Sequence, residues 1–147
     1  MENAANNLHK KLIESSANES FGQILLEAID EGLSALGEGV QVSLYFHLED
    51  KFKIRKHEIP QRVGEFSDAL ERIFGLGTRH LEILFMKSLH SKIKLVCNWP
   101  TSCKWVVPEV TFQEYVRLMK QKFEEAIANE NKVELFVDAG EKQEQYS

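Results

Sequence analysis

The sequence has few of the residues that break regular structure or cross-link a small fold. Its 147 residues include three Pro, eight Gly and two Cys, while 43% are hydrophobic and 28% are charged. This is ordinary globular composition and excludes a fibrous or disordered chain. No apolar run approaches the roughly 20 residues that a membrane span needs, and residues 1–16 lack the apolar stretch of a signal peptide. We therefore expect a cytoplasmic protein without a membrane-spanning segment.

The two cysteines, Cys97 and Cys103, lie in one short segment. In the cytoplasm such thiols stay reduced, so a disulfide framework is not expected. Structural zinc requires four Cys or His ligands in paired spacings, and no histidine lies near these thiols in sequence. We expect neither a metal nor a cofactor.

Local motifs of catalysis are missing as well. The sequence contains no phosphate-binding Gly-rich loop, Gly-x-Ser-x-Gly elbow, His-Glu-x-x-His pair or calcium loop. His47 lies near Glu49, but residues two apart on a helix do not face each other, so His47 is interpreted as a boundary histidine. His80 and His90 are out of phase on a helical repeat and do not form a metal pair. We predict that the protein is not an enzyme and has no catalytic residues.

Hydrophobic spacing predicts helices in the first half of the chain. Residues 1–18 are polar and indicate at most a loose helix. Ser20 and Gln23 match a capping box, which predicts that a firm amphipathic helix begins at Ser20 and stops at Gly37. Its buried face would carry apolar residues at three- and four-residue spacing, namely Leu25, Ile29, Leu33 and Leu36.

The segment from Val40 to Phe52 is interpreted as a second helix, with a strand as the alternative because its first five residues alternate with a period of two. Val42 and Phe46 widen its apolar arc, which predicts a central helix. A third helix is predicted from about Val63 to Phe74. It is followed by Gly75, which suits a left-handed cap.

A fourth helix is predicted to start with Thr78 as its cap and to reach about Ile93. Residues 94–108 contain two prolines and two tryptophans and predict a short extended or hairpin-like flap. Thr111 and Glu114 form a capping box that launches a fifth helix ending near Asn129. Residues 133–137 are expected to form a small strand, and residues 139–147 a disordered tail. Together these elements predict one mainly α domain over residues 1–147, a compact bundle of about five helices.

Charge is unevenly distributed along the chain. Residues 1–50 carry a net charge of −7, residues 51–94 carry +5 and residues 95–147 carry −3. The basic block either pairs with acidic helices of the same domain or attracts nucleic acid. The acidity of the whole chain favours internal pairing. The nucleic-acid alternative would use the basic residues of this block: Lys53, Arg55, Lys56, Arg62, Arg79, Lys87, Lys92 and Lys94.

Four aromatic or imidazole side chains are candidates for a ligand site or an interface, namely Tyr45, His47, Trp99 and Trp105. One hypothesis places a small-molecule pocket under the flap between Trp99 and Trp105. The competing interpretation assigns these large rings to the core or its cover.

The segment from about Gly22 to Ile93 resembles the fifth type of Nitrosopumilus output domain, a family of small archaeal domains. The matching residues occur in order: Gly37-Glu38-Gly39, Tyr45 to Glu49, Lys51-Phe52, Glu58-Ile59-Pro60, Phe66, Ala69-Leu70-Glu71, Ile73-Phe74-Gly75, Gly77 and Leu81-Glu82. Val63 departs from the pattern, which has a proline there, and residues 94–147 lie outside the match. The resemblance implies a family-like core at about residues 19–93, followed by a C-terminal extension.

Such domains are predicted outputs of signalling pathways without assigned catalysis, ligand or site residues. The resemblance therefore implies regulation by contact. We expect a non-enzymatic domain that binds a protein partner or a second copy of itself, with nucleic acid as a less favoured partner.

Overall fold

The computed structural model describes the backbone of residues 2–97 and 104–144, and the side chains of residues 16–97 and 104–129. In this part of the chain there are α-helices and short 3₁₀ turns and no strand. The elements follow one another as α1 (Glu2–Ser34), α2 (Glu38–Phe52), η1 (Lys56–Gln61), α3 (Val63–Phe74), η2 (Gly75–Gly77), α4 (Thr78–Val96) and α5 (Phe112–Glu144). The mainly α fold class and the helical bundle are as predicted.

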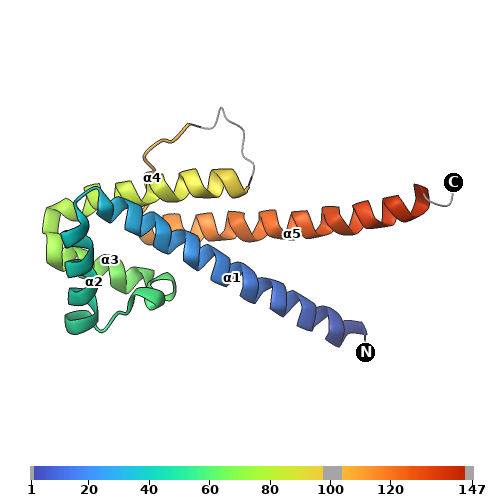
Figure 1. The fold of residues 1–147 in the computed structure, drawn as a ribbon, viewed down its shortest axis with the longest axis horizontal. Helices are drawn as coiled ribbons and strands as arrows, with labels where there is room; N and C mark the ends of the chain where they lie inside the picture. The colour runs from blue at the N-terminus through green and yellow to red at the C-terminus, as the bar shows by residue number, and fades with distance from the viewer. Residues whose placement is uncertain (1, 98–103, 145–147) are drawn as a thin grey trace.

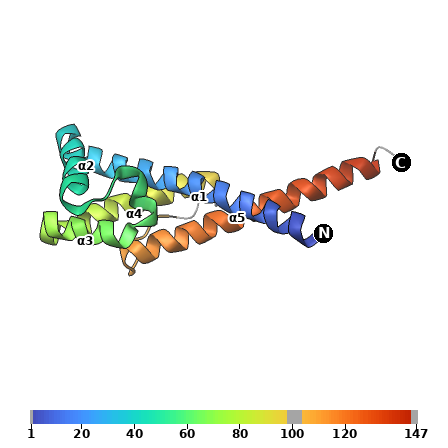
Figure 2. The ribbon, with the colours of Figure 1, turned by 90° about the horizontal axis from the view of Figure 1, so that it is seen from below.

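The helices form a body from which two long helices project. α2 and α3 lie at one end, α4 runs beside α5, and α1 crosses this pair (Figure 1). Seen from below, the N-terminal part of α1 and the C-terminal part of α5 extend past the other helices on the same side of the molecule (Figure 2). Among the described residues, no helix is long and apolar enough to cross a membrane.

The core is one continuous cluster to which every α-helix contributes. At its centre three phenylalanine rings meet, Phe66 of α3, Phe85 of α4 and Phe112 of α5, with centroids 5.8 to 6.4 Å apart. Each of these side chains is almost completely buried. α5 therefore supplies part of the central packing, although it lies outside the family-like segment.

The predicted start of a helix at Ser20 is wrong, because α1 runs through it without a break. Ala17 and Phe21, four residues apart, are both buried on the core side. A capping box works only where the preceding backbone leaves the helix, and nothing before Ser20 ends it. The predicted stop is close to the observed one, since Gly37 lies just past α1 and has a φ of 113°.

Predictions for the C-terminal region are also wrong in part. α5 continues to Glu144, so residues 133–137 are helical, and so are residues 139–144 of the tail that we expected to be disordered. Val133 and Val137 favour strands only weakly, and the segment from Phe112 to Ala139 contains neither Gly nor Pro to stop the helix. Residues 145–147 lie outside the described part of the chain.

The predicted flap begins three residues later than expected and forms no hairpin in its described part. α4 extends to Val96, and residues 104–110 run without regular secondary structure. The guanidinium of Arg79 donates to the carbonyls of Val110 and Pro108 at 3.3 and 3.2 Å, which ties this segment to α4. Residues 98–103 lie outside the described residues.

Of the two predicted threonine caps, one is confirmed and one is wrong. At the start of α5 the backbone N–H of Glu114 donates to Oγ1 of Thr111 at 3.2 Å, as expected of an N-cap. Thr78 is not a cap, because η2 leads directly into α4 and Thr78 already has helical dihedrals. Its buried hydroxyl instead donates to the carbonyl of Leu70 at 3.0 Å and fastens α4 to α3.

Candidate interaction surface on helix α2

Helix α2 carries apolar side chains on its outer face as well as on the inner face that packs against the core. Only Leu44 and Leu48 are buried against the core. Val42 and Phe46, which we expected in the buried arc of a central helix, are 72% and 71% exposed. They are four residues apart and so lie side by side on the helix surface. The helical interpretation of this segment is confirmed, but its central position is wrong.

A sharp turn ends α2 and brings the next segment back alongside it. Lys53 adopts left-handed dihedrals, with φ 56° and ψ 37°, and the N–H of Ile54 donates to the carbonyl of Leu48 at 3.0 Å. The side chain of Ile54 is buried, so the turn is fixed by both a hydrogen bond and an apolar contact. Arg55 and Glu58 consequently face the last turns of α2.

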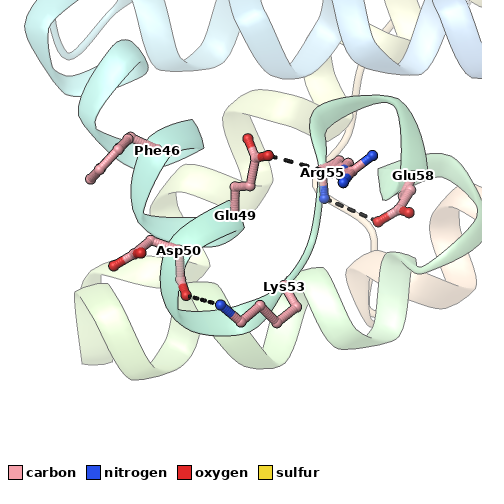
Figure 3. Close-up of a pocket in the computed structure, with 6 residues that line it drawn as sticks. All are labelled: Phe46, Glu49, Asp50, Lys53, Arg55 and Glu58. Carbon is pink, nitrogen blue, oxygen red and sulfur yellow. Dashed lines mark hydrogen bonds and ion pairs between the residues drawn. The ribbon is translucent and has the colours of Figure 1, made fainter.

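An open cleft of about 800 Å³ lies at this turn. Its lining is mixed in charge and consists of Phe46, Glu49, Asp50, Lys53, Arg55 and Glu58. Glu49 lies 3.8 Å from Nε of Arg55, and the ammonium of Lys53 donates to the backbone carbonyl of Asp50 at 2.9 Å. Figure 3 shows Phe46 and the carboxylate of Asp50 directed to the same side of α2, away from Glu58.

Glu58 stabilises the far wall of the cleft. Its carboxylate accepts from the backbone N–H of Arg55 at 3.1 Å and from the guanidinium of Arg62 at 3.2 Å. The hydrogen bond from Arg55 and then the contact with Arg62 hold the pKa of Glu58 below its ordinary range. Glu58 is therefore ionised and engaged within the fold at neutral pH.

A second hollow, of about 390 Å³, lies between α2 and the end of α3. It is mostly apolar and is lined by Gly39, Val40, Ser43, Leu44, His47, Ile73 and Phe74. His47 is half-buried there and its ring centroid is 6.1 Å from that of Phe52. Positions 39, 43 and 47 neighbour positions 42 and 46 on a helix, so the hollow and the exposed pair are adjacent. Val42, Phe46 and the residues lining this hollow are called the α2 surface below.

Tyr45 faces away from this surface and anchors α2 to α1. Its hydroxyl donates to Oδ1 of Asp30 at 2.5 Å, and Nε2 of Gln41 donates to the same oxygen at 2.8 Å. Lys56 pairs with Oδ2 of Asp30 at 2.9 Å, and its ammonium lies 4.9 Å from the Tyr45 ring centroid. Burial, followed by the hydrogen bond to Asp30, raises the pKa of Tyr45 far above its ordinary value. Tyr45 thus remains neutral and structural.

The basic residues considered for nucleic acid are dispersed and mostly engaged. Lys92 pairs with Glu31 at 2.7 Å and Glu27 at 3.6 Å, joining α4 to the acidic α1 as Lys56 joins η1 to it. Lys53, Arg62 and Arg79 likewise donate to carbonyls or carboxylates of the chain. Arg55 forms an ion pair with Glu49. Lys87 is exposed beside a shallow groove between α1 and α4. Pairing with acidic side chains of the same domain, the favoured interpretation of the basic block, is therefore present for Lys56 and Lys92, which reach α1, and for Arg55 and Arg62, which pair with nearby glutamates.

The tryptophan candidates lie far from α2 in the chain. Trp105 is half-buried, with its ring 5.4 Å from that of His90 and 5.8 Å edge-on from that of Tyr115. Burial and then the charges of Lys94 and Lys122 lower the pKa of His90. Trp105 therefore acts as a cover over α4 and α5 in the described structure. Trp99 and Cys103 lie outside the described residues, and the pocket hypothesis that involves Trp99 stays a prediction.

Metal-binding groups are not gathered in the part of the chain that the structure describes, where no three His, Cys, Asp or Glu side chains are placed to hold an ion.

The chain was also compared with known proteins. No family model, no curated protein and no solved structure matches it.

Sequence reasoning proposed His47, which does line the α2 surface, but missed the outward position of Val42 and Phe46. The signal was present in the spacing. At 100° per residue, a helix that buries residues 44 and 48 turns residues 42 and 46 roughly 120° to 160° away from them. The apolar residues of α2 therefore form a buried face and a separate exposed face, and not one wide buried arc.

Proposed function

We propose that the chain is a non-enzymatic signalling or regulatory domain that acts by binding a protein partner through the α2 surface. The observation that carries the proposal is the exposure of Val42 and Phe46, at 72% and 71%, as neighbours on one helix. Single exposed apolar residues are common, whereas an adjacent pair next to an apolar hollow is typical of a contact site.

Binding would remove the exposed part of these two side chains from water. Complete burial of a Val or Phe side chain contributes roughly 1.5–3 kcal/mol, and aromatic residues are frequent energetic centres of interfaces. Phe46 is suited to this role because its ring stands at the junction of the cleft and the exposed face.

The surface is also held in place before any partner binds. Leu44 and Leu48 pack into the core, and Asp30 fixes the opposite face of α2 through Tyr45 and Gln41. A preorganised face loses less entropy on association than a mobile one. This rigidity favours recognition of a partner by contact.

The resemblance of residues 22–93 to an archaeal family of predicted output domains supports the same role, since such domains are thought to act through partners. We further propose that the protein works in the cytoplasm. The partner is another protein or a second copy of this chain.

Affinity capture from native extract tests the proposal. The bait is the full chain, with the double variant Val42→Ser, Phe46→Ser compared against a control, Leu95→Ser, Val106→Ser, whose two residues are 79% and 76% exposed elsewhere on the fold. We expect a protein that is retained by the wild type and the control but absent with the α2 variant. Retention by all three baits, or recovery of nucleic acid alone, would contradict the proposal.

The homodimer version needs a separate measurement. Light scattering after size exclusion at high concentration should then give a dimer that the α2 variant abolishes and the control retains. A strict monomer at every concentration rules out self-association and leaves a different protein as the partner.

A further inference from the structure

We propose that the partner segment recognised by the α2 surface is a cationic amphipathic helix, with basic side chains on either side of an apolar centre. This inference rests on the proposed function and specifies the chemistry of the partner. It comes from the charges that flank the exposed apolar pair.

Two carboxylates bracket Val42 and Phe46 along α2. Glu38, Val42, Phe46 and Asp50 follow one another at four-residue spacing, so each side chain lies beside the next along a ridge. These four residues are called the α2 ridge. With a rise of 1.5 Å per residue the ridge is about 18 Å long, which matches several turns of a partner helix.

The two carboxylates make no ion pair within the described fold. Among the residues whose side chains are described, neither Glu38 nor Asp50 has an ion-pair or hydrogen-bond partner for its carboxylate. Other acidic groups nearby are engaged, since Glu49 pairs with Arg55 and Glu58 with Arg62. The ridge thus presents unneutralised negative charge at both ends of an apolar centre.

Nearby basic groups do not form an ion pair with the Asp50 carboxylate. The ammonium of Lys53 is turned back onto the Asp50 carbonyl, and Arg55 points to Glu49 across the cleft. Lys51 follows Asp50 directly and therefore projects about 100° away from it around the helix. A cation brought by a partner can reach the Asp50 carboxylate on the open side.

Phe46 adds to the attraction for a cation. Its ring and the Asp50 carboxylate point to the same side of α2 (Figure 3). A Lys or Arg side chain placed between them would form an ion pair with the Asp50 carboxylate and a cation–π contact with the Phe46 ring. The cation–π contact alone contributes about 0.5–1 kcal/mol at an exposed site. Nucleic acid, being anionic, would be repelled by the same carboxylates.

A helix fits this ridge better than an extended peptide. No sheet edge is available to add a strand in the described part of the chain, whereas apolar residues at four-residue spacing match the anchors of a helix that packs into a groove. The hollow between α2 and the end of α3 provides the groove beside the ridge. Charge complementarity would then fix orientation and speed the encounter.

Titration of the isotope-labelled full chain with synthetic peptides, followed by NMR, tests the inference. Three peptides of about 18 residues are used: an amphipathic Leu and Lys helix, the same pattern with Glu in place of Lys, and a scrambled Leu and Lys sequence that cannot form an apolar face. We expect the first alone to shift the backbone resonances of Val42, Phe46 and Asp50 saturably, with an affinity that falls as salt is added.

Charge-reversal variants provide the matched comparison. Glu38→Lys with Asp50→Lys should weaken binding of the Leu and Lys helix by about tenfold or more. Glu109→Lys with Glu125→Lys, which makes the same charge change on residues away from α2, should leave the affinity within about twofold, because distant charges are screened. Circular dichroism of both variants checks that the helical fold is retained.

The outcomes separate this inference from the proposed function. Equal binding of the Glu helix at α2 would overturn the cationic partner and leave an apolar contact site. Shifts spread over all acidic surfaces, unchanged by the α2 reversal, would overturn it as well. If no helical peptide shifts α2 while the capture experiment still depends on Val42 and Phe46, the partner is not a cationic helix.

Discussion

The ring of Phe85 lies directly against the backbone of Gly32. A Cβ atom placed on Gly32 would be 2.5 Å from Cδ1 and 2.8 Å from Cε1 of that ring. The ring has no room to retreat, because it is fully buried and packs against Phe66 and Phe112. The approach of α1 to α4 therefore depends on the absence of a side chain at position 32.

Gly32→Ala should destabilise the fold. A contact of 2.5 Å with an enclosed ring should place the overpacking cost at about 2–3 kcal/mol, and the better helix propensity of Ala offsets about 1 kcal/mol, which leaves a net loss of about 1–2 kcal/mol. Urea unfolding followed by circular dichroism measures it. Gly39→Ala serves as the control, because no atom lies within 4 Å of a Cβ there and its φ is not positive. If the Gly32→Ala variant is as stable as wild type, α1 and α4 are less closely packed than the structure indicates.

Thr111 should be worth about 1 kcal/mol as the N-cap of α5. Thr111→Ala removes the acceptor for the N–H of Glu114, so the free energy of unfolding should fall by that amount. Thr111→Ser keeps the hydroxyl and should retain most of the stability. Equal losses for Ala and Ser would indicate that the Thr methyl group, and not the cap, is what matters.

The two predicted threonine caps, Thr111 and Thr78, show which parts of the fold the sequence can and cannot predict. Spacing predicted the bounds of α3 and came close for α2 and α4, because each helix does bury apolar residues at helical spacing, such as Leu44 and Leu48 of α2. Thr111 and Thr78 look alike as caps, but only the first follows non-helical backbone. The 3₁₀ turn before Thr78 gives this residue helical dihedrals and so prevents it from acting as a cap. Such a turn depends on how α3 and α4 meet, which the sequence around Thr78 does not reveal.

The candidate site was less predictable than the fold. Apolar residues on both sides of α2 read as one wide buried arc, and the distinction requires knowing that α2 has neighbours on one side only. His47 was identified because a lone polar ring among apolar residues is conspicuous. Glu38 and Asp50 were not predicted as site residues, because their role depends on having no ion-pair partner within the described fold. That in turn depends on the directions of the Lys53 and Arg55 side chains, which the sequence does not give.

Lys92 tests the pairing of the basic block with α1. Lys92→Met removes the contacts with Glu27 and Glu31 and should cost at most about 1 kcal/mol at low salt, since the two carboxylates are exposed. The loss should shrink in 1 M salt, where the Debye length is about 3 Å. Lys87→Met, on the same helix but without an ion pair to an acidic side chain among the described residues, should change stability less. A salt-independent loss would point to packing of the Lys92 stem instead.

Glu82 should make the fold less stable as the pH rises. It is 9% exposed, and its Oε2 accepts a hydrogen bond from the Ser67 hydroxyl at 3.3 Å. Burial raises the pKa of this carboxyl. The Ser67 hydrogen bond and then the charge of Arg79 oppose the shift, while the charge of Glu71 adds to it. The folded state therefore holds the proton more firmly than the unfolded state does. Stability falls as the pH rises from the ordinary value of 4.5 through the raised folded pKa.

Glu82→Gln removes this titration. We expect the variant to be more stable than wild type at pH 7 and the difference to disappear below pH 4.5, where Glu82 is protonated in both states. Glu31, whose pKa is lowered chiefly by its hydrogen bond with Lys92, loses its stabilising charge as the pH falls, but it does so in both proteins. The difference between the two unfolding curves, measured from about pH 4 to pH 8, consequently isolates Glu82. A variant that is less stable at pH 7 would show that the ionised carboxylate gains more from Arg79 than it loses by burial.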